Sequence, residues 1–284
     1  MACSSYLLNN VEDIGRGAEL IKRRRGVIIG VFSAKGGVGK TTAVVNIGAA
    51  MAQKLKNRVV VVETNMTASN LGLYMGILDS PVVIQDVVLG KRKLEDAICT
   101  TDFGIHVIPG SPAFVGEIGS IDIREILEQL RKKYDAILLD SAPGFGPEVY
   151  ASMRACDELV VVCQPQVPAI AGTLQTFRTA NHQKLPILGA IMNRVTGKRY
   201  EVPISHIKKI LNWPLIGVVP EDDMVPESTT RAIPLVIYSQ NSPAAVEFRK
   251  IAQAILTHIR ARRRVAPRRR RKIRRKRLAG SRSK

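Results

Sequence analysis

Short apolar segments alternate with longer amphipathic segments along most of the chain. The apolar segments are rich in β-branched residues and run without apolar–polar alternation, which is typical of strands buried on both faces of a sheet. These predicted strands cover residues 27–33, 59–63, 105–109, 136–140, 159–163, 187–193 and 215–220. The pattern therefore indicates one large sheet with buried central strands.

Helical periodicity fills the intervals between these strands. The predicted helices cover residues 40–55, 122–133, 169–180 and 203–211. A last helix is predicted over residues 243–260, because apolar residues from Ala245 to Ile259 recur on one side of it. Such strand–helix alternation predicts an α/β fold, with a mostly parallel central sheet and helices on both faces in three layers.

Basic residues are concentrated at one end of the chain. The net charge is +19, and residues 260–284 hold 15 Lys or Arg and no acidic residue, which leaves +4 for the rest. A segment this charged does not pack into a core. We therefore expect an N-terminal extension (residues 1–25), one domain (26–260) and a basic, disordered tail (261–284).

The cysteines and the hydropathy indicate the cellular compartment of the protein. Cys3, Cys99, Cys156 and Cys163 form no CxxC pair and no His/Cys cluster, so the spacing gives little support to a metal or iron–sulfur site. A reducing compartment fits this pattern. No apolar stretch reaches the roughly 18 residues that a spanning helix needs. We expect a cytoplasmic protein.

A glycine-rich turn joins the first predicted strand to the first predicted helix. Backbone N–H groups in such a turn, together with the helix N-terminus, favour phosphate oxygens. The Lys-Thr-Thr ending supplies a cation for the outer phosphates and a hydroxyl for Mg²⁺, which a bare glycine turn would not need. The residues predicted to bind the nucleotide are Gly36, Gly37, Val38, Gly39, Lys40, Thr41 and Thr42. We expect a P-loop NTPase that binds ATP and Mg²⁺.

Two departures from the general phosphate-loop pattern mark a subtype. Ala34 stands where the first glycine is usual, and Lys35 follows it. The sequence KGGVGKTT resembles the deviant Walker A motif of the MinD/ParA ATPases. In that family the early lysine reaches the partner's phosphates across a nucleotide-sandwich dimer. The resemblance implies this role for Lys35 and an ATP-dependent homodimer; a second cation would also offset charge developing in the transition state.

Later segments extend the resemblance. Residues 134–143 resemble the family's Walker B strand, which implies that Asp140 holds the magnesium shell, although an aspartate there can also act as a cap. Asn193, Pro220 and Glu221 lie at strand ends that resemble adenine-contacting segments; strand-end turns explain these residues about as well. Residues 70–76 resemble MinD more than the ParA segregation proteins.

One position departs from the family pattern. The family carries Asp-x-Asp after the second strand, and the corresponding residues here are Glu63 and Asn65. Either Asn65 orients water and hydrolysis persists slowly, or the chain binds ATP and dimerises with little hydrolysis. The predicted catalytic residues are Lys35, Lys40, Asn65 and Asp140. The predicted metal-binding residues are Thr41, Glu63 and Asp140.

The resemblance implies a MinD-like switch whose ATP-bound dimer places the division site or another large assembly, with an activating or cargo protein as partner. The tail would meet an anionic membrane surface or bind nucleic acid without sequence preference, and the first of these implies peripheral association with the inner face of the cell membrane. A ParA-type DNA-partitioning ATPase and a nucleotide-dependent binding module are the alternatives. An iron–sulfur carrier of the same superfamily would need a cysteine pair.

Overall fold

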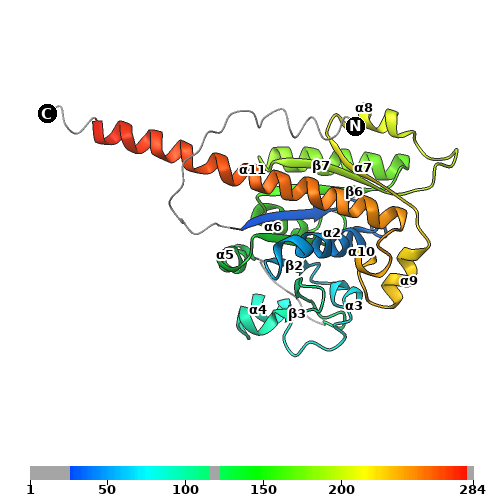
Figure 1. Ribbon diagram of the computed structural model, residues 1–284, viewed down its shortest axis with the longest axis horizontal. Helices are drawn as coiled ribbons and strands as arrows, with labels where there is room; N and C mark the ends of the chain where they lie inside the picture. Colours follow the sequence, from blue (N-terminus) through cyan, green and yellow to red (C-terminus); the bar gives the residue numbers. More distant parts are fainter. Residues whose placement is uncertain (1–25, 115–121, 280–284) are drawn as a thin grey trace.

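A single twisted sheet forms the centre of the molecule (Figure 1). The computed structural model describes residues 26–114 and 122–279, and side chains as far as residue 263. The strands lie in the order β3-β4-β2-β5-β1-β6-β7-β8, parallel throughout except for the antiparallel pair β3–β4. They are β1 (Val27–Phe32), β2 (Val59–Thr64), β3 (Cys99–Thr100), β4 (His106–Ile108), β5 (Ala136–Ser141), β6 (Glu158–Cys163), β7 (Ile187–Val195) and β8 (Leu215–Pro220).

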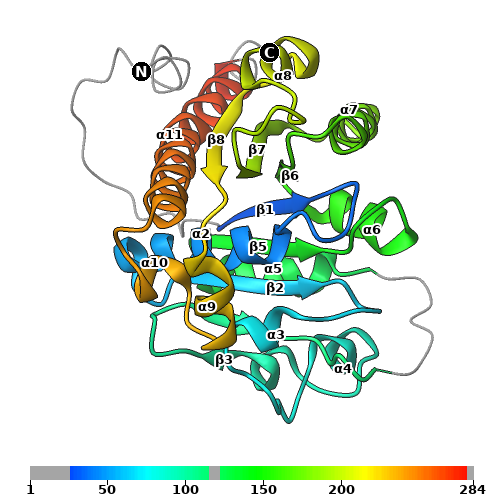
Figure 2. The ribbon, with the colours of Figure 1, turned by 90° about the vertical axis from the view of Figure 1, so that its right-hand side faces the viewer.

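Helices cover both faces of this sheet, so the predicted three-layer α/β fold is confirmed. In Figure 2, α2, α10 and α11 lie on one side, and α6 and α7 lie on the other. The helices are α2 (Lys40–Leu55), α3 (Leu71–Tyr74), α4 (Ile84–Val88), α5 (Arg124–Lys133), α6 (Pro147–Ala155), α7 (Val167–His182), α8 (Ile204–Leu211), α9 (Met224–Thr230), α10 (Leu235–Tyr238) and α11 (Pro243–Ala279), with the 3₁₀ turn η1 (Leu94–Ala97). Among the described residues, no helix combines the length and apolar character needed to cross a bilayer.

Packing on both faces of the sheet explains why the central strands are continuous apolar segments. In β1, Ile29 packs into the layer formed with α2 and α11, while Ile28 packs into the opposite layer with α5. Both side chains are almost fully buried. Every position of a central strand therefore faces apolar neighbours, and each strand predicted from sequence matches the observed one within two residues at each end.

The carboxyl ends of these parallel strands meet at one edge of the sheet. Asp140 pairs in register with Val31 of β1 on one side and with Glu63 of β2 on the other. The phosphate loop leaves β1 at this same edge and enters α2 through Gly39, whose φ of 86° lies in the left-handed region. The fold thus brings the phosphate loop, Glu63 and Asp140 together, although Lys40 and Asp140 are 100 positions apart.

The predicted end of the last helix is wrong. α11 does not stop near residue 260 but continues to Ala279, so the disordered tail expected for residues 261–284 is helical as far as Ala279 (Figure 1). Alanine and arginine favour helix, and ion pairs of Arg262 and Arg263 with the domain hold the helix where the tail was expected to begin. The predicted extension, residues 1–25, lies outside the described residues.

Candidate nucleotide-binding site

A buried ion pair lies beneath the phosphate loop. Lys40 Nζ, in the first turn of α2, lies 2.5 Å from Asp140 Oδ1 at the end of β5. The Thr41 hydroxyl donates to the other oxygen, Asp140 Oδ2, at 2.7 Å. Lys40 and Asp140 are both buried. The sequence prediction placed these three residues at one site, and the structure brings them into direct contact.

Asn193 supports the phosphate loop from beneath. Asn193 is 4% exposed, and its Nδ2 donates to the Val38 carbonyl at 2.8 Å. This bond gives a carbonyl of the phosphate loop a buried donor and fixes that part of the loop. A Cβ atom at Gly39 would come within 2.3 Å of that Nδ2, so the loop needs glycine there both for its φ and for this contact. The sequence suggested an adenine contact for Asn193 and gave no sign of this loop contact.

The ends of β7 and β8 are joined beside this asparagine. Arg194 has a φ of 56°, in the left-handed region. Its guanidinium donates to both carboxylate oxygens of Glu221 at 2.9 Å. The Glu221 amide donates to the Val195 carbonyl at 3.0 Å. Pro220 is half-buried at the end of β8. The three residues predicted near adenine therefore lie at neighbouring strand ends.

The exposed part of the phosphate loop carries the second lysine. Lys35, Gly36 and Gly37 are exposed. Ala34, at the position where a glycine is usual, packs under α7, because a Cβ atom at Gly172 would lie only 2.5 Å from the Ala34 Cβ. The departure from the general motif is thus matched by a glycine on the neighbouring helix. Lys35 is left at the surface of the loop, where an incoming phosphate group can meet it.

Glu63 is buried and held by backbone amides. Its Oε1 accepts from the Asn65 N–H at 3.0 Å, and its Oε2 accepts from the Asn70 and Leu71 N–H groups at 2.9 and 3.0 Å. Burial, together with the nearby charge of Asp140, raises the pKa of Glu63 to about 8, against the opposing effect of these donors. The carboxylate of Glu63 thus holds both ends of the loop that follows β2.

The side chain of Asn65 is turned into that same loop. Its Nδ2 donates to the Ala68 carbonyl at 2.7 Å, and its Oδ1 accepts from the Ala68 N–H at 3.2 Å. Ser69 donates to the Asn65 carbonyl at 2.7 Å. Both ends of the amide are therefore occupied within a local turn of the kind that asparagine favours.

One further carboxylate at this edge was not predicted from sequence. Glu148, in the first turn of α6, accepts from the Met66 N–H at 3.0 Å and from the Thr67 hydroxyl at 3.2 Å. The Pro-Glu pair that starts α6 is a helix-start signal. That signal locates the helix, but it does not reveal the contact with the loop after β2.

The residues present fit a magnesium ion of the kind that nucleotides carry. Mg²⁺ is usually held by one or two protein oxygens together with water and phosphate oxygens. Thr41 and Asp140 offer such oxygens beside the phosphate loop. Across the described residues, no group of three His, Cys, Asp or Glu side chains forms a metal site of its own. Two protein oxygens leave the other ligand positions to phosphate and water, which suits a metal that arrives with its nucleotide.

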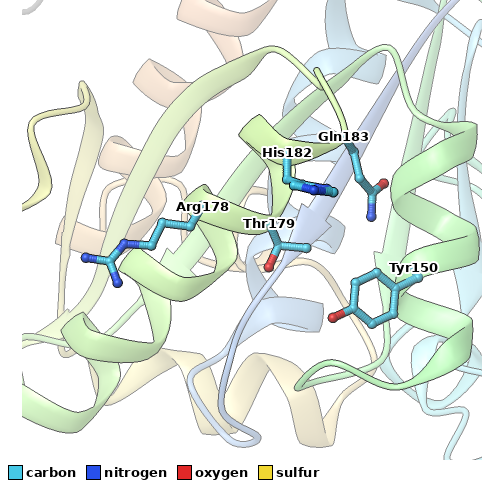
Figure 3. A pocket seen from close by; sticks show the side chains of 5 residues that line it. All are labelled: Tyr150, Arg178, Thr179, His182 and Gln183. Atoms are coloured by element: carbon cyan, nitrogen blue, oxygen red, sulfur yellow. The ribbon is translucent and has the colours of Figure 1, made fainter.

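A polar hollow of about 330 Å³ lies elsewhere, between α6 and α7 (Figure 3). It is lined by Tyr150, Arg178, Thr179, His182 and Gln183. None of these residues belongs to the phosphate loop or to the strand ends described above. This hollow is therefore separate from the nucleotide site.

Comparison with known proteins agrees with this arrangement. A family model described as an AAA domain matches residues 26–187. An uncharacterised ATP-binding protein of Methanocaldococcus jannaschii is 33% identical over 232 residues, which cover 81% of this chain and 88% of that protein. The solved structure of the cell division ATPase MinD of Pyrococcus furiosus is 31% identical with a TM-score of 0.74, over 81% of this chain and 98% of that one. The chain belongs to the MinD/ParA family of ATPases.

A second MinD/ParA structure bears on the ligand. The septum site-determining protein MinD of Pyrococcus horikoshii, solved in complex with Mg-ADP, is 31% identical with a TM-score of 0.74, over 81% of this chain and 96% of that one. Nucleotide and magnesium binding thus belong to the family at this level of similarity. The family and the fold predicted from sequence are both confirmed.

Proposed function

We propose that this MinD/ParA ATPase is a nucleotide-dependent switch: ATP joins two copies face to face, and hydrolysis separates them. The observation that carries the proposal is the loop itself, with Lys40 fixed on Asp140 and Lys35 exposed beside it. One lysine is positioned to serve the bound nucleotide, and the other is available to a neighbouring copy. The output of such a switch is location: placement of the division site or of another large assembly.

Each site residue has a role in this proposal. The backbone N–H groups of Gly36, Gly37, Val38 and Gly39, with Thr42, hold the phosphates, and Lys40 contacts the outer ones. Thr41 and Asp140 hold Mg²⁺, which supplies charge stabilisation to the phosphoryl group when bound. Glu63 supports this shell from behind through the loop it organises. Asn193, Pro220 and Glu221 border the adenine.

The surface around the phosphate loop supports a face-to-face dimer. Val167, at the start of α7, is 70% exposed, and Tyr200, on the loop after β7, is 66% exposed. The Val202 N–H donates to the Pro165 carbonyl at 2.8 Å, which places these two segments side by side at the carboxyl edge of the sheet. Large apolar side chains beside a cationic loop are what a second copy would cover.

The dimer is tested by measuring molar mass with ATP, with ADP and without nucleotide. ATP is expected to produce a dimer that ADP does not, and Lys35→Ala is expected to abolish it, because the cation that reaches the partner's phosphates is lost. Lys56→Ala, at the far end of α2, is the matched control. A Lys35→Ala chain that dimerises with ATP as the parent does would refute the assignment.

Hydrolysis is expected to be slow because of Asn65. An amide can orient water but cannot take its proton, and here both ends of the amide are also bound to Ala68. Asn65→Asp is expected to raise the turnover number about tenfold at unchanged ATP affinity. Equal steady-state rates for the two chains would show that this residue is not limiting. A parent chain with no turnover would favour the nucleotide-dependent binding module.

The basic end of α11 supplies the partner surface. It would meet an anionic membrane surface, giving peripheral association, or non-specific nucleic acid, as in a ParA-type partitioning ATPase. The test compares liposome flotation with a DNA mobility shift, for the full chain and for a chain ending after Arg263. That end point retains the ion pairs of Arg262 and Arg263 with the domain. Binding that survives truncation would exclude the tail as the contact.

The positioning role is tested by the localisation of a tagged copy. Lys40→Ala and the truncated chain are the comparisons, and both are expected to lose the pattern of the parent. A diffuse distribution in all three would refute the positioning switch. Pull-down of the ATP-bound dimer, with the ADP form as control, then addresses the activating or cargo protein.

A further inference from the structure

The loop between β2 and α3 is held from two sides by carboxylates. Glu63 binds the two ends of the loop through the Asn65, Asn70 and Leu71 N–H groups. Glu148 binds its middle through the Met66 N–H and the Thr67 hydroxyl. Asn65, the residue at the family's water-linked position, lies between these two anchors.

Glu148 reaches this loop from an element tied to the phosphate loop. It is the second residue of α6, and α6 follows the turn that leaves Asp140. In that turn the Gly144 N–H donates to the Ser33 carbonyl at 2.9 Å, just before the phosphate loop. A Cβ atom at Gly36 would be 4.0 Å from the Pro143 ring. The phosphate loop therefore contacts the turn after Asp140, and this turn leads directly into α6.

Asn65 acts on water only if its loop is held in place. Its amide is engaged by Ala68, so its direction is set by the shape of the loop rather than by the side chain alone. We propose that Glu148 is a positioning residue for ATP hydrolysis, which holds the Asn65 loop in register with the phosphate loop through Met66 and Thr67. This inference rests on the proposed hydrolysis by this site.

The ordinary role of a glutamate at the start of a helix provides the contrast. Glu125 occupies the same position in α5, the second residue of its first turn, and is exposed. Negative charge there stabilises any helix through the macrodipole. Glu148 shares that effect and adds the two contacts with the loop. If replacing Glu148 changes catalysis and replacing Glu125 does not, the change is therefore due to the lost loop contacts and not to the helix dipole.

The test compares Glu148→Ala and Glu148→Gln with Glu125→Ala. Loss of a charged acceptor for two donors is expected to lower kcat about tenfold for Glu148→Ala, with KM for ATP within about twofold. Glu148→Gln retains one acceptor oxygen and is expected to recover part of kcat. Glu125→Ala is expected to match the parent. Hydrogen exchange of the Met66 amide is expected to speed up in Glu148→Ala alone.

Two results would overturn the inference. Unchanged protection of the Met66 amide in Glu148→Ala would show that the contact does not hold the loop. Faster exchange with unchanged kcat would show that the loop is held without consequence for the reaction. A parent chain without turnover refutes the hydrolytic switch instead. Glu148→Ala and Glu125→Ala are then compared in a chain that also carries Asn65→Asp. Absence of turnover in the Asn65→Asp chain also overturns this role of Glu148.

Discussion

The two ends of the parallel sheet use charged side chains differently. At the amino ends of β5 and β6, three acidic side chains are each bound by arginine: Asp135, Asp157 and Glu158. Arg262 and Arg263 of α11 take part in these pairs, and His258 also lies 2.9 Å from Glu158. Each of these acids has a basic partner, and this matched cluster fixes the helix to the sheet.

The carboxyl end is not balanced in this way. Asp140 is shared by Lys40 and Thr41, and Lys35 adds a second cation on the exposed loop. The glycine-rich backbone adds N–H donors at the start of α2. Glu63 and Glu148, at the same edge, accept from N–H groups and a hydroxyl of the loop after β2 instead. The exposed Lys35 and the N–H groups of the phosphate loop are what a polyphosphate needs. The comparison shows that a matched cluster of charges builds structure, whereas an exposed lysine and exposed loop N–H groups suit a ligand.

Lys40→Ala should have the largest effect on ATP hydrolysis at the carboxyl end. It removes the cation on the outer phosphates and leaves Asp140 buried without its ion-pair partner, so hydrolysis is expected to fall by about 100-fold or more. Steady-state phosphate release measures it, with circular dichroism to confirm folding. Lys54→Ala, in the last turn of the same helix, is the control and should hydrolyse ATP at the parent rate.

Asn193→Ala should have a smaller effect at the same edge. The Val38 carbonyl loses its donor and is free to turn toward the phosphates, so ATP affinity is expected to fall about tenfold. Titration calorimetry measures this change. Asn212→Ala, on the turn after α8, is the control. Unchanged affinity would mean that the loop keeps its shape without the asparagine.

The features predicted correctly from sequence are those encoded by residues that are neighbours in the chain. The continuous apolar strands follow from burial on both faces, and the phosphate loop is one local segment between a strand and a helix. The order of strands then brings Asp140 beside it, as expected for a parallel sheet. Local pattern and a simple topology rule were enough for these features.

Two contacts of the site that were missed are long-range. Asn193 meets Val38 across 155 positions, and Glu148 meets Met66 across 82. No local pattern encodes such pairs. β3 has only two residues and was too short to register as a strand. The continuation of α11 was missed because composition alone does not show that Arg262 and Arg263 find acidic partners.

Asp135→Asn tests the cluster at the amino end of the sheet. It should have the smallest effect of these substitutions, and that effect should be on stability. Burial alone would raise the pKa of Asp135, but the hydrogen bond from Arg58 and the charge of Arg263 together lower it. An acid with a lowered pKa stabilises the fold above its unfolded pKa of about 3.9, and this contribution is lost as the pH falls through the folded value.

Loss of this carboxylate is therefore expected to cost about 1.5 kcal/mol at pH 7, with the two chains converging in acid, while ATP hydrolysis stays at the parent rate. Urea unfolding at pH 7 and below pH 3 measures the difference. Asp122→Asn, whose pair with Arg124 is exposed, is the control and should change neither quantity. A fall in hydrolysis for Asp135→Asn would mean that the two ends of the sheet are coupled, and that the matched cluster also sets the geometry of the phosphate loop.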